Sequence, residues 1–317
     1  MKVTEHIQKA DSPLFTIEIL PPKKGEDINT LFGHVESLLD FAPAFIDVTY
    51  HREEFVYKER PDGSFQKSIT RKRPGTVGIC AAIQNRYNID TVPHVICGGF
   101  SREDTENMLI ELDFLGIENV LALRGDPIKT EPGFVPHPEG HCYASDLVGQ
   151  VANMNRGIYL DEDLEHPPAT NFCIGAAGYP EKHFEAPNKD MDFKYLKKKV
   201  EQGAEFIVTQ MFFDNQVYFD FVKLCRDNDI YIPIIPGLKP VATLKHLTLL
   251  PQFFHLDLPD ALAKEVSKCK DNKAVKEVGV EWCVQQCKEL IDFGVPVLHF
   301  YTMSRSELVK KVAKKVF

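Results

Sequence analysis

The chain has 317 residues, of which 44% are hydrophobic and 26% charged, which are the proportions of a globular protein. A formal net charge of −9 argues against the basic surface that nucleic acids require, so we expect no nucleic-acid partner. No apolar run approaches the ~20 residues that span a bilayer, and the first residues lack the apolar centre of a secretory signal, so we expect a cytoplasmic protein without a membrane partner.

The cysteines are scattered and contain no CxxC pair, which favours a reduced protein with buried thiols. Cys283 and Cys287 are four residues apart on an expected helix and, together with Cys269, could hold a soft metal. Burial on an apolar helix face is the commoner role of such thiols. No ligand spacing such as HExxH occurs, so we predict no metal site.

Short apolar runs alternate with longer amphipathic ones along the chain. The short runs are rich in Val, Ile, Phe and Tyr and are bounded by Gly, Pro and Asn, which is typical of buried β-strands. The expected strands span 14–20, 44–50, 91–97, 118–125, 171–177, 205–212, 230–237 and 295–302.

Segments with helical periodicity separate these strands. Residues 101–116 begin with Ser101 as an N-cap, repeat apolar residues at helical spacing and stop at Gly116. Residues 76–87 fit either a strand or a helix, but the strand that follows at 91–97 favours a helix. The same helical pattern occurs at 191–204, 215–229 and 280–294.

Eight strands, each followed by a helix, predict a closed parallel (βα)8 barrel in which residues 1–317 form a single domain. A doubly wound sheet is the alternative, but the first strand leads into PPKKGED rather than a glycine-rich phosphate turn. The longest segments without a pattern, 51–74 and 126–143, are predicted to be irregular loops at the ends of strands, where long ordered loops are usually functional.

Polar residues recur at the strand ends, where barrels of this kind build their active sites. Glu18 lies within an apolar strand, where desolvation would raise its pKa and let it keep a proton near neutrality, as a general acid requires. Arg124, Gly125 and Asp126 directly follow the fourth strand. The other polar residues at strand ends are Thr49, Tyr50, His94, Tyr179, His183, Thr209, Gln210, Tyr301, Thr302 and Arg305.

This set supplies an acid, a second carboxylate, cationic groups and amide donors, but no nucleophile triad. From the residues alone the chemistry is therefore open. An organic cofactor that performs the difficult step is compatible with the set.

At these residues the chain resembles the methylenetetrahydrofolate reductase family, in its short bacterial form, from about residue 12 to 307. The matching pieces are "IEILPPK", "VTY", "PHVIC", "LRGDP", "YASDLV", "AAGYPEKH", "LKKKVEQGAEFIVTQMFFD", "IPIIPGLKPV" and "HFYTMSR", and their order and spacing are specific. The resemblance implies an FAD-binding barrel that reduces methylenetetrahydrofolate to 5-methyltetrahydrofolate for methionine synthesis. It also implies NADH or NADPH as co-substrate with NADH favoured, ping-pong hydride transfer through FAD, a homo-oligomer, and no C-terminal regulatory domain.

The family pattern implies roles for residues at matching positions. Glu18 matches the catalytic acid that protonates the leaving folate nitrogen, and Asp126 matches a carboxylate that favours the cationic iminium. Gln210 matches an amide that meets nicotinamide and folate in turn, and Arg305 matches a folate contact. The implied FAD contacts are Thr49, Tyr50, His94, Arg124, Gly125, Asp126, Tyr143, Ala144, Tyr179, His183, Asp192 and Lys199.

Two regions depart from the family pattern. His246 and Leu250 stand where bacterial members place a folate-binding glutamine and a stacking phenylalanine, and residues 51–66 are charged where a short neutral turn is expected. Three rival functions follow from the same residues. They are an FAD barrel that oxidises proline, a cofactor-free lyase or transferase that uses Glu18 and Asp126 as an acid–base pair, and a non-catalytic folate or flavin carrier.

Overall fold

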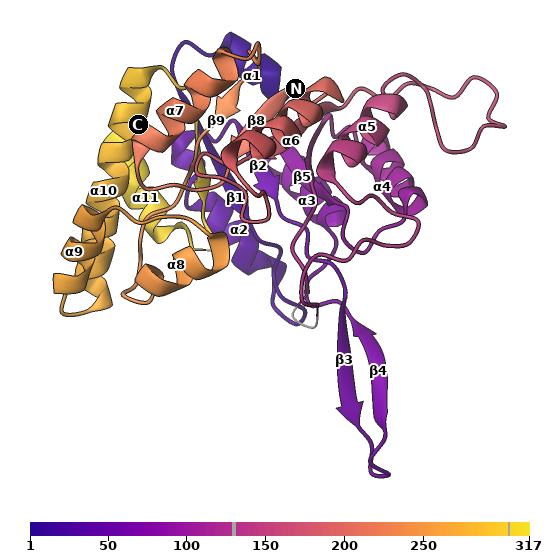
Figure 1. The fold of residues 1–317 in the computed structure, drawn as a ribbon, viewed down its shortest axis with the longest axis horizontal. Helices are drawn as coiled ribbons and strands as arrows, with labels where there is room; N and C mark the ends of the chain where they lie inside the picture. Colours follow the sequence, from indigo (N-terminus) through magenta and orange to yellow (C-terminus); the bar gives the residue numbers. More distant parts are fainter. Residues whose placement is uncertain (129–130, 304) are drawn as a thin grey trace.

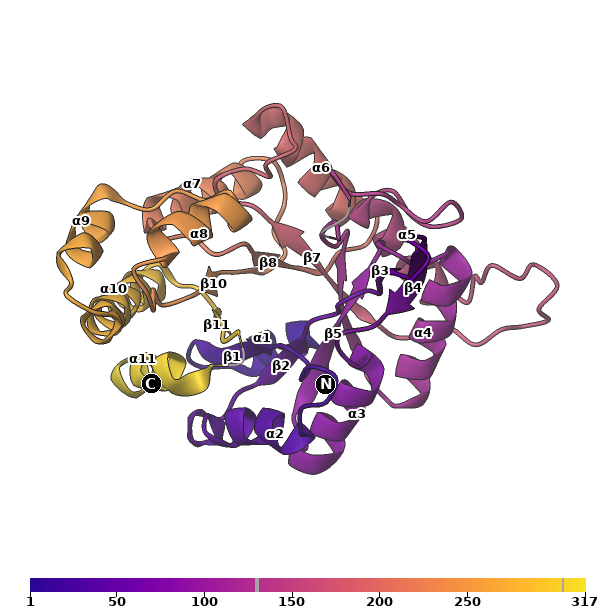
Figure 2. The same ribbon diagram turned by 90° about the horizontal axis from the view of Figure 1, so that it is seen from below.

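The computed structural model describes residues 1–128, 131–303 and 305–317, and it shows a parallel β-barrel surrounded by helices (Figures 1 and 2). The strands pair in the order β1, β2, β5, β6, β7, β8 and β9, and the circle continues through β10 and β11 back to β1. The predicted (βα)8 barrel is therefore confirmed. Its strands are β1 (Leu14–Ile19), β2 (Phe45–Val48), β5 (Asp90–Ile96), β6 (Asn119–Leu123), β7 (Cys173–Gly178), β8 (Phe206–Thr209), β9 (Ile234–Ile235), β10 (Gly237–Leu238) and β11 (Val297–Tyr301).

The seventh position of the barrel is shared by β9 and β10, which lie on either side of Pro236. Proline has no backbone N–H to give to a ladder, so the strand is interrupted there. The Pro236 carbonyl still accepts a hydrogen bond from the His299 N–H at 3.2 Å. Because β9 pairs with β8 and β10 pairs with β11, the two short strands together close the barrel. The strand predicted at 230–237 exists, but it starts later and is broken.

Helices cover the outside of the barrel, and their ends follow the capping signals of the sequence (Figure 2). The Ser101 hydroxyl caps α4 (Arg102–Phe114) by accepting from the Asp104 N–H at 3.0 Å, and Gly116 follows the helix at φ +69°. The helical interpretation of 76–87 is confirmed by α3 (Thr76–Tyr87). The other helices are α1 (Val3–Lys9), α2 (Ile28–Glu36), α5 (Ala144–Met154), α6 (Lys189–Glu201), α7 (Asn215–Arg226), α8 (His246–Phe254), α9 (Asp260–Lys268), α10 (Asn272–Phe293) and α11 (Ser306–Val316), with a short 3-10 helix at Leu39–Phe41. Within the described ranges, no helix is both long enough and apolar enough to cross a bilayer.

Two apolar layers hold the barrel together. The larger lies between strands and helices and includes Ile17 and Leu147. The smaller combines residues from the first halves of the strands, such as Phe45 and Phe206, with Val3 of α1. This second layer fills the N-terminal end of the barrel, so the polar side chains of the strand ends gather at the opposite end.

Residues 51–74 correct one prediction, because much of this expected loop is an antiparallel hairpin of β3 (Glu54–Glu59) and β4 (Phe65–Thr70). The sequence Pro-Asp-Gly at 61–63 is a turn signal, and Gly63 adopts φ +79°. The many charges hid the alternating apolar residues on either side of it. Figure 1 shows the hairpin projecting away from the barrel. The described part of 126–143 has no helix or strand as far as Tyr143, as predicted.

Candidate active site

The C-terminal ends of four strands bring ionisable side chains together inside the barrel. Glu18 on β1 stands in register with Asp47 on β2 and with Tyr301 on β11. Residues in register on parallel strands point to the same face of the sheet, so these side chains share the barrel interior. His94 on β5 joins them, because its Nε2 lies 3.6 Å from Glu18 Oε2 and 3.8 Å from Asp47 Oδ2.

Glu18 has the environment that its apolar strand predicts, with a side chain only 12% exposed. Burial raises its pKa to about 7, and this value balances the lowering effects of His94 and Lys239 against the raising effect of Asp47. Burial also lowers the pKa of His94, against the opposing effect of the Glu18 charge. Glu18 can therefore hold a proton near neutral pH and give it up, as a general acid must.

Asp47 is a member of this group that the sequence analysis missed. Its carboxyl group is fully buried, and neither oxygen has a hydrogen-bond partner among the described residues. Burial raises its pKa to about 6, against the opposing effect of His299. The Nδ1 of His299 is in turn 2.9 Å from the Thr16 hydroxyl. The missed signal was a charged residue inside an apolar strand, the same pattern that identified Glu18.

The segment after β6 presents a cation, a glycine and a carboxylate in succession. Arg124 forms an ion pair with Glu185 at 2.5 Å. Gly125 has φ +83°, and a Cβ there would come within 3.3 Å of Ile96, so conformation and space both favour glycine. Asp126 is exposed, yet its charge adds to burial in raising the pKa of Tyr179. Asp126 therefore faces the residues at the end of β7.

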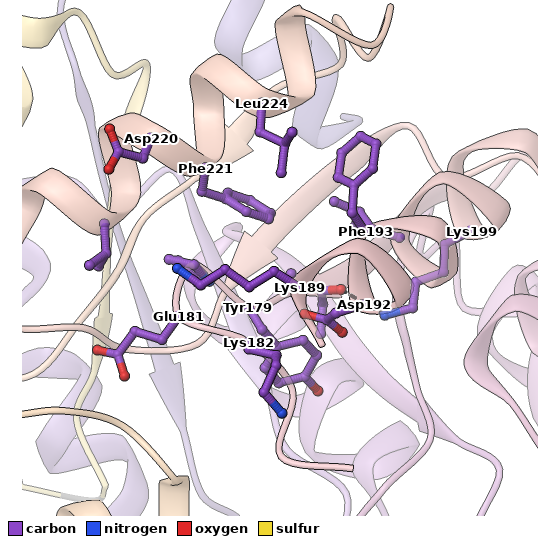
Figure 3. A pocket seen from close by; sticks show the side chains of 15 residues that line it. Tyr179, Glu181, Lys182, Lys189, Asp192, Phe193, Lys199, Asp220, Phe221 and Leu224 are labelled. Carbon is purple, nitrogen blue, oxygen red and sulfur yellow. Dashed lines mark hydrogen bonds between the residues drawn. The ribbon is translucent and has the colours of Figure 1, made fainter. Parts of the chain in front are cut away.

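A second group of predicted residues gathers between the end of β7 and α6. Asp192 accepts a hydrogen bond from the His183 N–H at 3.0 Å, and Lys199 Nζ donates to the Ala177 carbonyl at 2.9 Å. Tyr179, Asp192 and Lys199 line a pocket to which α6 and α7 contribute (Figure 3). Burial lowers the pKa of Lys199 to about 8. Lys199 therefore belongs to this pocket and not to the solvated face of its helix.

The end of the barrel at which the strands finish is called the mouth here. Four further predicted cofactor contacts differ in burial there, and they are Thr49, Tyr50, Tyr143 and Ala144. Thr49 is buried, and its hydroxyl has no partner in the part of the chain that the structure covers. Tyr50 packs edge-on against Phe100 with ring centres 5.0 Å apart. Tyr143 is exposed and directly precedes α5, whose first residue, Ala144, is buried. Thr49 and Tyr50 directly follow β2, and Tyr143 and Ala144 stand at the start of α5.

The side of the mouth formed by β8, β10 and β11 carries the two predicted folate contacts. Gln210 is partly buried, and its side-chain oxygen accepts from the Met211 N–H at 2.9 Å. Arg305 is exposed just before α11. The sequence analysis did not single out Lys239, which follows β10. Burial lowers its pKa to about 8, against the opposing charge of Glu18 and with the added charge of Arg305.

Of the two regions that depart from the family pattern, the one with His246 and Leu250 lies in α8. His246 Nδ1 accepts a hydrogen bond from the Ala242 N–H at 3.1 Å, so this ring stabilises its own loop. Leu250 is buried in an apolar cluster with Leu262 and Val266. In this structure the His246 side chain therefore supports the segment after β10, and the Leu250 side chain is part of the core.

Comparisons with known proteins show the family of the chain. The family model described as methylenetetrahydrofolate reductase matches residues 2–316. Methylenetetrahydrofolate reductase (NADH) 1 of Arabidopsis thaliana is 32% identical over 312 residues, covering 95% of this chain and 47% of the plant protein. The 5,10-methylenetetrahydrofolate reductase of Salmonella typhimurium is 29% identical over 294 residues, covering 92% of this chain and 87% of the bacterial protein.

A solved structure has a similar fold. It is described as an uncharacterized protein from Clostridium thermocellum that binds two copies of 5-methyl-5,6,7,8-tetrahydrofolic acid. The two share a TM-score of 0.59 at 15% identity, covering 99% of this chain and 97% of that chain. At this identity the similarity supports the fold alone.

The fold and the site define a class, the (βα)8 barrels with an ionisable site at the strand ends. Within it, the chain belongs to the methylenetetrahydrofolate reductase family, because the family model covers almost its whole length. The chain spans about half the length of the plant relative and most of the length of the bacterial one.

Proposed function

We propose that this protein reduces methylenetetrahydrofolate to 5-methyltetrahydrofolate, with a reduced nicotinamide dinucleotide as electron source, FAD as bound cofactor and residues 1–317 as one catalytic domain. Family membership supports the folate substrate. The observation that carries the proposal is Glu18, a carboxyl group inside the barrel mouth whose pKa is raised to about 7. Opening the methylene bridge needs a proton donor of this kind.

The residues at the mouth fit FAD. Arg124 and Lys199 supply positive charge suited to a pyrophosphate, and Gly125 leaves room for a flat ring beside the backbone. Thr49 Oγ1 and His94 Nε2 are buried without hydrogen-bond partners among the described residues, so both can bond to a ligand. When bound, FAD would carry hydride from the nicotinamide to the folate.

In this proposal the chain's own residues bind the folate and move one proton. Glu18 protonates the folate nitrogen as its bond to the methylene carbon breaks, and the bonding electron pair stays on that nitrogen. The Thr302 hydroxyl donates to the Glu18 carbonyl at 2.7 Å and fixes the end of β1. The carboxylate of Asp126 favours the cationic carbon–nitrogen unit that forms. Gln210 and Arg305 bind the folate from the opposite side of the mouth.

The test is the visible spectrum of the purified protein, supplied with FAD and followed without oxygen. We expect the flavin absorbance to bleach on adding NADH and to return on adding methylenetetrahydrofolate. A protein that neither contains nor accepts FAD would overturn the proposal and favour a cofactor-free enzyme. Bleaching by proline would identify the proline-oxidising alternative, and a flavin that responds to no substrate would identify a carrier.

We propose NADH as the preferred donor, because the plant relative carries NADH in its name. The flavin should then be reduced with a higher kcat/KM by NADH than by NADPH. The same anaerobic reduction followed with each dinucleotide measures this ratio, and a ratio that favours NADPH would reverse the assignment.

A further inference from the structure

Lys239 directly follows β10 (Gly237–Leu238). The β10–β11 ladder ends with Leu238 opposite Phe300, so the next step sets Lys239 opposite Tyr301. The residue before a proline is restricted to extended conformations, and Pro240 comes next. Leu238 is buried in the outer apolar layer, and side chains alternate along a strand. Lys239 therefore faces the barrel interior.

Tyr301 is the register partner of Glu18, and Lys239 comes one step after the Leu238–Phe300 pair, so Lys239 and Glu18 lie on either side of Tyr301 in one inward-facing row. Tyr301 leaves the Glu18 carboxyl free, since its hydroxyl donates to the Thr209 carbonyl at 2.5 Å. Its ring lies against Gly237, where a Cβ would collide with it. The charges of Lys239 and Glu18 act on each other across this row, and each partly offsets the effect of burial, which raises the pKa of Glu18 and lowers that of Lys239.

The other ionisable groups that face Glu18 are Asp47 from β2, His94 from β5 and Tyr301 from β11. Asp47 is an acid, and burial lowers the pKa of His94. Lys239, whose pKa lies at about 8, is therefore a cation near neutral pH and acts on the Glu18 carboxylate in addition to His94. Among the described residues Lys239 forms no ion pair, either with Glu18 or with another carboxylate, so its charge is not neutralised elsewhere and acts on Glu18 over a longer distance.

The segment that carries Lys239 is fixed in place. Two residues further on, the Val241 backbone packs directly on Gly279 of α10, where any Cβ would collide with it. The Ala242 N–H is then held by His246 of α8. Lys239 thus lies between β10, which pairs with β11, and a segment that packs against α8 and α10.

We propose that Lys239 is a positioning residue of the folate half-reaction, whose ammonium group stabilises the Glu18 carboxylate left after proton transfer to the folate nitrogen. This inference rests on the proposed function, in which Glu18 is the acid. An acid whose conjugate base is stabilised gives up its proton more readily. Flavin reduction by the nicotinamide needs no proton from Glu18, so only the folate half-reaction should depend on Lys239.

The test compares Lys239→Met, which keeps the length of the side chain without its charge, with Lys239→Arg, which keeps the charge. Stopped-flow absorbance measures flavin reduction by NADH and flavin reoxidation by methylenetetrahydrofolate, each as a function of pH. In Lys239→Met we expect flavin reduction within about twofold of the unmodified protein and reoxidation roughly three- to tenfold slower. The pH at which reoxidation falls off should rise by about one unit, and Lys239→Arg should keep the original profile.

Each other outcome has a distinct meaning. An unchanged reoxidation profile in Lys239→Met overturns this inference and leaves the proposed function intact. Slower reoxidation with an unshifted profile also overturns it and assigns Lys239 to folate binding. An unmodified protein that reduces no folate would overturn the proposed function itself. Should Lys239→Met fail to fold, Lys239→Gln provides the same comparison.

Discussion

At the scale of single residues, burial of charge governs the barrel mouth. Glu18, Asp47 and His94 share one desolvated space, and burial favours the neutral form of each. The two carboxyl groups therefore keep their protons to higher pH than carboxyl groups in water. Carboxyl groups in this environment can donate a proton near neutral pH. The folded protein becomes less stable when Glu18 and Asp47 ionise.

Replacing Glu18 with Gln tests the assignment of the acid. The amide keeps the shape of the side chain but has no acidic proton to give. We expect folate reduction to fall by about two to four orders of magnitude, while NADH oxidation with an artificial acceptor persists. Steady-state assays with the two acceptors measure this difference. If both activities survive, Glu18 is not the acid.

Replacing Asp47 with Asn tests how much ionisation of the buried carboxyl group lowers the free energy of unfolding. Its pKa rises from 3.8 to about 6 on folding, so the unmodified protein should lose stability as pH rises through this range. The loss should be on the order of 3 kcal/mol, spread between roughly pH 4 and 7. Urea unfolding of both proteins across this range measures it. A variant with the same pH dependence as the unmodified protein would contradict the raised pKa.

At the scale of elements, the seventh strand and the hairpin show how local sequence can conceal structure. Pro236 interrupts a strand whose halves are held by different neighbours, so its length depends on the closed barrel. The strands of the hairpin pair only with each other within the described ranges. One of its faces exposes Phe55, Tyr57, Phe65 and Ile69. Isolated hairpins are marginally stable in water, so this one contributes little to the stability of the barrel.

Shortening the hairpin tests its independence. Residues 56–68 can be replaced by Asn-Gly, because Phe55 and Ile69 are register partners and a two-residue turn can join such a pair. We expect the thermal midpoint of the barrel to change by less than about 2 °C, since a change well below 1 kcal/mol shifts a protein of this size very little. Calorimetry measures it. A large fall in the midpoint would show that the hairpin supports the barrel.

At the scale of the whole molecule, one end of the barrel is filled and the other carries the site. The apolar layer at the start of the strands includes Val3 of α1, and the ionisable residues stand at the strand ends. Figure 1 shows α1 and the projecting hairpin on opposite sides of the barrel. A ligand of the mouth therefore contacts loops that follow many different strands, and its binding should stabilise the entire fold.

Added FAD should therefore raise the thermal midpoint, because a ligand present at 100 times its Kd adds about 2.7 kcal/mol to the free energy of unfolding. We expect Lys199→Met to lose much of this shift, since Lys199 lines the pocket beside α6. Lys197→Met is the matched control, because Lys197 is exposed on the same helix. Thermal scans at several FAD concentrations measure the shift. Equal shifts in both variants would remove Lys199 from the FAD site.

The sequence by itself determined the alternation of strands and helices, because periodicity and capping are local. Ser101, Gly116 and the run of apolar strands were sufficient to predict the barrel, and the apolar neighbours of Glu18 were sufficient to predict its raised pKa. Only the tertiary structure decided which side chains meet. Asp47, Lys239 and His299 join Glu18 because strand register sets them in one interior, and register depends on contacts between residues far apart in the chain.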